Sequence, residues 1–332
     1  MAASAFPEGL FGVLDPDDER SRVVEELVLA DPHGKRSARV FRDTFDQLYD
    51  GQRTGRYRWD QLYKTEKTHF GTLLEINLRR EFDGVIGDGE VLDYLISGVE
   101  VDCKYSQSSG SWMLPPECFG RLLLVAHAND AAGVWSLGVV RASLSNRREA
   151  VNRDGKTSLN RRGRSQVEWI RFEAALPPNV LLSLDLDTVA AIVQPRSGQA
   201  RIVELLRRVT NRRIGRNTIA TVGQQVDYMA RIRDNGNGAR TRLRREGYLV
   251  IGGDYMAHTD VARALGCAVP EPGEVVSVRV VPALSREHWA VELDGGWWRL
   301  AAADEVCSVA APWLPSISSP RGTREIGPNQ QS

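Results

Sequence analysis

The sequence predicts an α/β domain followed by a second, mainly helical domain. Up to about residue 172 of the 332-residue chain, an amphipathic helix is followed by short apolar runs that alternate like strands. Beyond residue 200, apolar residues recur instead at the helical spacing i, i+3, i+4 and i+7. Pro177-Pro178-Asn179 interrupts the chain between these two regions. We therefore expect one domain at residues 1–178 and another at residues 179–316.

One long helix and several strands are expected in the first domain. Five apolar residues at near-helical spacing predict a helix over residues 66–82: Phe70, Leu73, Leu74, Leu78 and Phe82. Alternating or apolar runs predict strands at residues 90–104, 121–126, 134–140 and 166–172. The polar, arginine-rich stretch 144–165 is expected to be a loop, and Asp50-Gly51 a turn in a region rich in tyrosine and arginine.

The second domain begins with a succession of helices. One helix is predicted by Ile202, Leu205, Leu206 and Val209, and the next by Ile219, Val222, Val226 and Met229. A break at residues 235–238 leads into an arginine-rich helix ended by Gly247, and a strand follows at residues 248–251. This order is typical of a helix-turn-helix with a wing. Short strands are then expected around Asp294-Gly295-Gly296, with a disordered tail at residues 317–332.

Composition excludes several classes of protein. Hydrophobic residues make up 42% and charged residues 26% of the chain, which excludes a wholly disordered, collagen-like or coiled-coil protein. No stretch approaches the roughly 20 apolar residues of a membrane span, and the acidic N-terminus lacks the basic start of a signal peptide. Four widely spaced cysteines form no CxxC pair, so we expect no disulfide framework or zinc ribbon and a cytoplasmic location: Cys103, Cys118, Cys267 and Cys307.

The net charge of zero is an average over unequal segments. Residues 1–31 carry eight acids and two bases, whereas residues 141–171 carry nine bases and three acids. Residues 201–247 carry twelve bases and four acids, and all twelve bases are arginine. Two arginine clusters in a neutral protein predict anionic partners, with DNA or RNA ahead of a membrane. A pair of solvated basic faces is the alternative interpretation.

The most informative pattern lies in residues 91–104. Ser97-Gly98 predicts a two-residue hairpin turn, and pairing around this turn places Asp93 opposite Asp102. Carboxylates opposed in this way, with Cβ atoms about 4.5–5.5 Å apart, repel each other unless a cation lies between them. The period of two places the charged side chains on one face and the apolar ones on the other: Glu100, Asp102 and Lys104 against Val99, Val101 and Cys103.

A carboxylate and lysine face of this kind suits metal-assisted hydrolysis of phosphodiester bonds. Carboxylates bind Mg²⁺ through oxygen, and the metal neutralises the scissile phosphate and lowers the pKa of a bound water. The lysine would orient or deprotonate that water. Glu75, which lies off the apolar stripe of the preceding helix, is placed to complete the site. A pattern this short is also compatible with a surface hairpin whose charges pair with one another.

The arrangement resembles the PD-(D/E)xK nuclease core and, more narrowly, the NaeI family of type IIE restriction endonucleases. Two specific stretches carry the resemblance, FDQLYDGQRTGRYRWDQLYKTEKTHFGTLLEINLRREF and VLDYLISGVEVDCKYS, with weaker similarity in GYLVIGGDYMAHTDVARALG and VVSVRVVPA. The resemblance implies a mixed sheet flanked by helices, and a catalytic set of Glu75, Asp93, Asp102 and Lys104, of which the three carboxylates bind the metal. In the PD-(D/E)xK motif a proline precedes the first aspartate, whereas Leu92 precedes Asp93 in this chain. The family's C-terminal DNA-binding domain agrees with the winged helix-turn-helix expected above.

The same resemblance implies a function and partners. We expect a homodimeric, Mg²⁺-dependent type IIE restriction endonuclease that cuts double-stranded DNA at a GC-rich palindrome. The family's best-known target is GCCGGC, cut to blunt ends. The type IIE class implies two DNA duplexes per protomer, the second of which stimulates cleavage, and a cognate DNA methyltransferase acting on the same site is a further expected partner. The candidate DNA-binding residues are Arg231, Arg233, Arg240, Arg242, Arg244 and Arg245.

Two rival functions remain alongside this one. The first is a sequence-specific DNA-binding regulator with a vestigial nuclease domain. The intact set of Glu75, Asp93, Asp102 and Lys104 argues against it. The second is a mismatch-nicking repair endonuclease, which only the family resemblance disfavours. Which arginines read base edges and which bind phosphates also stays open.

A ligase-like motif is a further feature of the resemblance. Leu48-Tyr49-Asp50-Gly51 is similar to the KxDG nucleotidyl-transfer motif of DNA ligases, with Leu48 where the nucleophilic lysine belongs. Because leucine has no nitrogen to form a phosphoramidate, ligase chemistry is excluded at that position. An ordinary polar turn is the alternative interpretation of this stretch.

Overall fold

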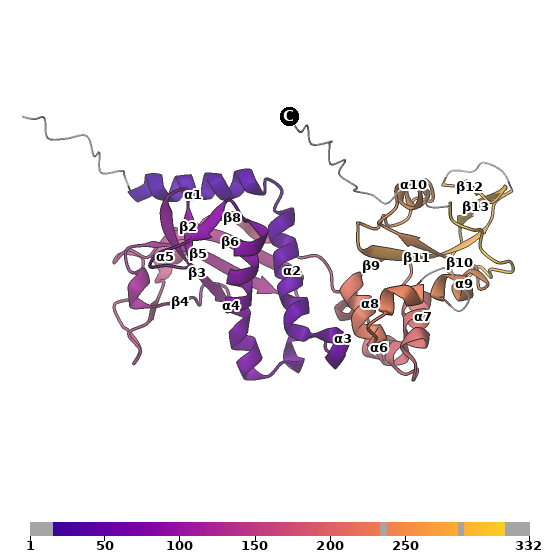
Figure 1. Cartoon of the computed structure of the whole chain (residues 1–332), viewed down its shortest axis with the longest axis horizontal. Coiled ribbons are helices and arrows are strands. Elements are labelled where there is room, and N and C mark those ends of the chain that lie inside the picture. Colours follow the sequence, from indigo (N-terminus) through magenta and orange to yellow (C-terminus); the bar gives the residue numbers. More distant parts are fainter. Residues whose placement is uncertain (1–15, 233–237, 285–288, 316–332) are drawn as a thin grey trace, which may run out of the picture. The chain divides into compact units, whose positions relative to one another are not determined.

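The computed structural model describes residues 16–232, 238–284 and 289–315, and these residues form two compact units (Figure 1). The first unit comprises Met1–Leu48 and Leu62–Pro178, and the second comprises Tyr49–Gln61 and Asn179–Ser332. The chain therefore enters the second unit twice, which no sequence pattern indicated. Within the described ranges, no helix combines the length and the apolar character that crossing a membrane requires.

A six-stranded mixed sheet forms the centre of the first unit. Its order is β1-β2-β3-β5-β6-β8, and every neighbouring pair is antiparallel except β3 and β5. The strands are β1 (Ile86–Asp88), β2 (Tyr94–Ile96), β3 (Val99–Ser106), β5 (Leu122–Asn129), β6 (Val134–Arg141) and β8 (Glu168–Ala175). The expected mixed sheet is confirmed, with two differences. Strand β1 was not predicted, and residues 90–93 form an irregular approach to β2 in place of a strand.

Three helices accompany this sheet: α1 (Pro16–Ala30), α2 (Lys35–Tyr49) and α4 (Lys64–Glu81). Aromatic contacts join them to the strands, since the Phe70 ring of α4 lies 4.6 Å from Phe45 of α2 and 4.3 Å from Tyr105 of β3. Figure 1 shows α2 and α4 side by side next to the sheet. Helix α4 confirms the helix predicted at residues 66–82. Helices α1 and α2 were not predicted, although the buried Phe41, Phe45 and Leu48 of α2 recur at helical spacing.

A second apolar layer packs on the sheet through β5. Leu123 and Val125 form a buried cluster with Trp112, Cys118 and Leu159. The polar stretch expected as a loop contributes to this layer. It contains β7 (Thr157–Ser158), which pairs with β4 (Met113–Leu114), and the short helix α5 (Arg161–Ser165). The loop prediction for residues 144–165 was therefore wrong in part, because one buried leucine and a helix-capping Asn160 order a segment that is otherwise polar.

The helices of the second unit pack around a common core. They are α6 (Leu186–Val193), α7 (Gly198–Arg208), α8 (Arg216–Gly223) and α9 (Ala239–Arg244), and their core includes Ile202, Ile219 and Leu243. Helix α7 matches the first predicted helix. The second prediction, which extended to Met229, was too long. Helix α8 ends at Gly223 because Gln224 adopts a left-handed conformation (φ 47°), and Val226 beyond it is 92% exposed.

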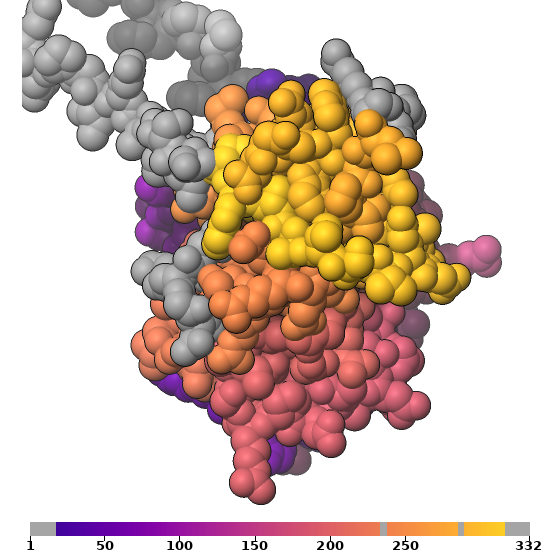
Figure 2. Space-filling view, turned by 90° about the vertical axis from the view of Figure 1, so that its right-hand side faces the viewer, coloured from indigo at the N-terminus to yellow at the C-terminus, as the bar shows by residue number. Residues whose placement is uncertain are grey.

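A five-stranded sheet completes the second unit, together with helix α10 (Met256–Ala264). Strands β9 (Arg213–Gly215) and β10 (Tyr248–Gly252) both pair with β11 (Glu274–Pro282), which also pairs with β13 (Gly296–Leu300), and β12 (Val291–Leu293) pairs with β13. Figure 2 shows the helical part of this unit, in red and orange, beside the later strands in yellow. The predicted strand after Gly247 and the predicted turn at Asp294-Gly295 are both confirmed.

The segment 49–61 contributes α3 (Gly51–Thr54) and a 3₁₀ turn (Trp59–Gln61) to the second unit. The Gln52 side-chain amide donates to the backbone oxygen of Gln225 (3.0 Å). The Asn179 amide donates to that of Tyr57 (2.9 Å). Gly51 has no room for a side chain, because a Cβ would lie 2.1 Å from Oγ1 of Thr221 on α8. Close packing thus holds this segment against α8.

Candidate active site

The β2–β3 hairpin has the register that the sequence predicts. Tyr94 pairs with Val101, Leu95 with Glu100 and Ile96 with Val99. The turn residues Ser97 and Gly98 both have positive φ, 48° and 75°, as a two-residue hairpin turn of the I′ type requires. The register brings the residue before β2, Asp93, to the end of the hairpin beside Asp102 and Cys103.

Asp93, Asp102 and Lys104 converge at this end of the hairpin. Oδ2 of Asp93 accepts a hydrogen bond from the backbone N–H of Cys103 (2.7 Å). The Lys104 ammonium lies 2.7 Å from Oδ2 of Asp102 and 3.6 Å from Oδ2 of Asp93. It also donates to the backbone oxygen of Cys103 (3.0 Å). One ammonium therefore faces two carboxylates, as expected for this face of β3.

Glu75 lies within electrostatic range of the same group. It is half-buried on α4, and its backbone oxygen accepts a hydrogen bond from the Tyr94 hydroxyl (2.8 Å), which ties α4 to β2. Burial raises the pKa of the Glu75 carboxyl; the negative charge of Asp93 raises it further, whereas Lys104 opposes the shift. Glu75 thus lies close enough to Asp93 and Lys104 for their charges to act on it, and Asp93 and Asp102 both lie beside Lys104.

Asp102 is the most deeply buried of the carboxylates, with 3% of the residue exposed. Burial raises its pKa to about 6; the Lys104 ammonium opposes this shift and the charge of Asp93 adds to it. Oδ2 of Asp102 is shielded from solvent, and the Lys104 ammonium lies 2.7 Å from it. A buried carboxylate oxygen of this kind is a donor suited to a cation.

Lys104 is an ammonium in this arrangement. Burial alone would lower its pKa, but the hydrogen-bonding and charge contributions of Asp102, followed by the charge of Asp93, outweigh burial and raise it. Three carboxylates then face a single positive charge, which leaves an excess of negative charge.

The donor set fits Mg²⁺, which takes oxygen ligands. Within the described residues, however, no three Asp, Glu, His or Cys side chains are already grouped at metal-binding distance. Glu75, Asp93 and Asp102 supply the oxygens, and the Lys104 ammonium lies beside two of them.

Two further residues position the site, although neither was predicted to belong to the catalytic set. The Glu100 carboxylate accepts hydrogen bonds from the backbone N–H groups of Glu90 (2.6 Å) and Val91 (3.0 Å), and so fixes the approach to Asp93. Gly89 allows the chain to turn there, because a Cβ at this position would lie 2.2 Å from the backbone oxygen of Leu92. The alternation along β3 placed Glu100 on the charged face, but its hydrogen-bond partners lie in an irregular segment that alternation does not predict.

The residues of the ligase-like motif lie in different surroundings. Leu48 is buried near the end of α2 (7% exposed), whereas Asp50 adopts a left-handed conformation (φ 45°) directly before α3. Gly51 is the first residue of α3, which belongs to the second unit. The similarity to a nucleotidyl-transfer motif stays a prediction.

The candidate DNA-binding arginines of the second unit differ in their exposure and in their contacts within the chain. Arg242 and Arg245 are exposed at and just beyond the C-terminal turn of α9. Arg240 donates to the backbone oxygen of Val250 (3.0 Å), and Arg244 donates to that of Ala311 (2.8 Å) and stacks on Trp313. Arg231 pairs with Asp227 (2.9 Å).

The structure therefore leaves Arg242 and Arg245 as the most available for a ligand. Arg233, the break at residues 235–237 and the tail at 317–332 lie outside the described residues.

Comparisons with known proteins cover nearly the whole chain. A sequence model of the restriction endonuclease NaeI family matches residues 21–309. The chain is also 46% identical over 317 residues to a type II restriction enzyme NaeI from Lentzea aerocolonigenes, an alignment that spans 92% of this chain and 97% of that enzyme. The family model therefore spans the β2–β3 hairpin and most of both units.

Proposed function

The chain belongs to the NaeI family of restriction endonucleases and is a homologue of a type II restriction enzyme, and from this premise we propose that it hydrolyses phosphodiester bonds of double-stranded DNA at the Asp93, Asp102 and Lys104 site with Mg²⁺. The observation that carries the assignment of the site is the convergence of Lys104 on both aspartates at the end of a hairpin. A DNA-binding regulator with a vestigial nuclease domain would have no reason to retain this arrangement.

Each side chain of the site has a distinct part in the proposed reaction. Asp93 and Asp102, with Glu75, would hold Mg²⁺ through oxygen, and the bound ion would neutralise the scissile phosphate and lower the pKa of a water. Lys104 holds its proton at Nζ in the arrangement described, so it would donate a hydrogen bond to a phosphate oxygen or to the attacking water. Glu100 and the Tyr94 hydroxyl keep the approach to Asp93 and helix α4 in place.

We further propose that the second unit binds DNA as a winged helix-turn-helix. Its order of α7, β9, α8, α9, β10 and β11, with β9 and β10 on either side of β11, supports this assignment. The exposed Arg242 and Arg245 would supply its contacts with phosphates or guanine edges. A second copy of the site bound here would activate cleavage, as the type IIE resemblance implies.

The target and the assembly are also part of the proposal. We expect a GC-rich palindrome, with GCCGGC cut to blunt ends as the first sequence to test. A palindrome is read by a symmetric dimer, so each protomer would cut one strand. A DNA methyltransferase acting on the same sequence would protect the host genome.

Plasmid cleavage tests this function directly. Purified protein is incubated with plasmid DNA and Mg²⁺, and the ends of the fragments are sequenced. Defined fragments with one common palindrome at their ends are expected. A smear of random ends, single-strand nicks only, or binding without any cleavage would contradict it.

A further inference from the structure

The nuclease unit carries an arginine-rich hairpin that the catalytic site does not use. We define the basic arm as residues 147–164. Its base is an antiparallel bridge between Arg147 and Leu159, reinforced by the backbone hydrogen bond from Arg148 to Ser158 (2.9 Å). Its tip is a tight turn in which Oδ1 of Asn152 accepts from the backbone N–H groups of Asp154 (3.0 Å) and Lys156 (2.9 Å). The arm is therefore an ordered element.

The basic arm is anchored on the same face of the sheet as the catalytic residues. Asp102 and Lys104 of β3 are in register with Leu123 and Val125 of the parallel strand β5, and so share a face with them. Those two residues form one buried cluster with Leu159 of the arm. In Figure 1 the arm, coloured as the bar shows for residues near 150, leaves the body of the first unit beside β4.

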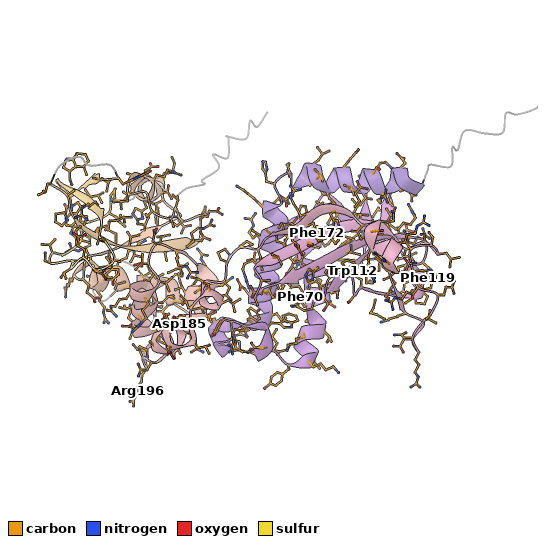
Figure 3. The ribbon with its side chains drawn as sticks, turned by 180° about the vertical axis from the view of Figure 1, so that it is seen from behind. Phe70, Trp112, Phe119, Phe172, Asp185 and Arg196 are labelled. Carbon is orange, nitrogen blue, oxygen red and sulfur yellow. The ribbon has the colours of Figure 1, made fainter. Side chains whose placement is uncertain are left out.

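Contacts with the turn before β5 fix the arm near the site. The Arg147 guanidinium lies 3.9 Å from the centre of the Phe119 ring. Gly155 packs on Pro116, where an added Cβ would lie 3.2 Å from its ring. Figure 3 labels Trp112 and Phe119, which belong to or pack against the same cluster as Leu159 of the arm. Cys118, between these contacts, is close enough to Asp102 and Lys104 for both charges to act on its thiol.

The charges of the arm are left unpaired. Elsewhere in the unit arginines form ion pairs, for example Arg42 with Asp130 (2.5 Å), Arg79 with Asp88 (2.9 Å) and Arg141 with Glu19 (2.6 Å). Five cationic side chains of the arm are exposed, and none of their charged groups forms an ion pair or hydrogen bond within the described chain: Arg148, Arg153, Lys156, Arg161 and Arg162. Only two acids, Glu149 and Asp154, lie among them.

We propose that the basic arm binds the phosphate backbone of the substrate duplex on the catalytic face, next to the bond that is cut. The proposal rests on the function proposed above and adds a binding surface to the same site. Unpaired cations on an ordered hairpin suit phosphates, because each contact releases counterions from the DNA and needs no particular base. The arm would therefore add affinity and set the position of the duplex, but it would not choose the sequence.

The test measures the binding of a site-containing duplex as a function of salt, with Ca²⁺ in place of Mg²⁺ so that the DNA stays uncut. A triple variant, Arg148→Ala with Arg153→Ala and Lys156→Ala, should bind about tenfold or more weakly at moderate salt. The slope of log affinity against log salt should fall by roughly 2–3, at about 0.9 per lost phosphate contact. Cleavage at limiting enzyme should fall in proportion to the affinity.

The matched control removes acids from the same arm. Glu149→Gln with Asp154→Asn should tighten binding, whereas mere damage to the arm would weaken binding in both variants. Unchanged affinity and salt slope in the triple variant, while wild type binds and cuts, would overturn the arm proposal alone. Dissociation of a dimer in the triple variant with unaltered affinity per protomer would also overturn it, since the arm would then contact a second copy. Wild-type protein that neither binds nor cuts DNA would instead refute the proposed function.

Discussion

Asp93 accepts a hydrogen bond from the backbone N–H of Cys103, with 2.7 Å between Oδ2 and the nitrogen. This bond joins the two sides of the hairpin beyond the last β2–β3 residue pair, Tyr94 and Val101. It also holds the Asp93 carboxylate beside Lys104, so a residue assigned to metal binding has a structural function as well.

The two functions of Asp93 can be separated by substitution. Asp93→Asn keeps an oxygen that can accept from Cys103 but removes the charge, whereas Asp93→Ala removes both. We expect both variants to lose cleavage, and only the alanine variant to lose about 1–2 kcal/mol of unfolding free energy, because it leaves the N–H unpaired. Denaturant unfolding and plasmid cleavage measure the two effects. Full cleavage by the asparagine variant would show that the charge of Asp93 is not needed.

The raised pKa of Asp102 predicts how Mg²⁺ binding depends on pH. Burial, the largest cause, raises this pKa to about 6, so the carboxyl becomes protonated as the pH falls through 6. Because the proton and the metal compete for the same oxygens, apparent Mg²⁺ affinity should fall by up to about tenfold per pH unit below 6, and excess Mg²⁺ should restore cleavage. Cleavage titrated with Mg²⁺ between pH 7 and 5 tests this. An apparent affinity that stays constant over that range would contradict it.

His258 predicts a pH dependence of stability in the second unit. Burial, together with the nearby Arg240 charge, lowers its pKa to about 4, whereas an unfolded histidine titrates near 6.5. Between these pH values His258 is protonated in the unfolded chain but neutral in the folded chain. The free energy of unfolding should therefore fall as the pH drops from 6.5 to 4, by about 3 kcal/mol at most. Urea unfolding at several pH values measures this fall. His258→Gln should flatten it; an equal fall in the variant would assign it to other groups.

Arg242 and Arg245 test the activation by a second duplex. Cleavage of a plasmid with one site should be slow and should increase when a short duplex carrying that site is added, by roughly 5–150-fold for a typical coupling. Arg242→Ala with Arg245→Ala should reduce this stimulation more than it reduces basal cleavage, and high salt should do the same. Arg263→Ala is the control, because Arg263 is paired with Asp260 on α10 (2.5 Å). Equal cutting of one-site and two-site plasmids, with added duplex only competing, would contradict activation.

The parts of the site that depend on local pattern were predictable from the sequence. The turn at Ser97-Gly98 and the period of two along β3 fix which residue faces which, so the pairing around Asp93 and Lys104 followed from a few positions. Glu100 was placed on the correct strand, but its bonds to residues 90 and 91 depend on an irregular turn.

Other features depend on contacts between distant segments, which no local pattern contains. The packing of residues 49–61 into the second unit requires the close approach of Gly51 to Thr221. The difference between Arg240, bound to Val250, and the exposed Arg242 likewise arises only when α9 packs against β10. The sequence marked both arginines equally, because helix period and charge are the same for both.

Single-turnover cleavage of site-containing DNA by three proteins tests the central claim most directly: wild type, Asp102→Asn and Lys104→Ala, each with Mg²⁺ and with a chelator. We predict cleavage by wild type only when Mg²⁺ is present, no measurable cleavage by Asp102→Asn, and a loss of about 10²-fold or more in Lys104→Ala. Binding of the duplex by both variants should remain close to that of wild type. Wild-type cleavage rates in either variant, or wild-type cleavage that persists in the chelator, would contradict the assignment of this hairpin as the metal-dependent nuclease site.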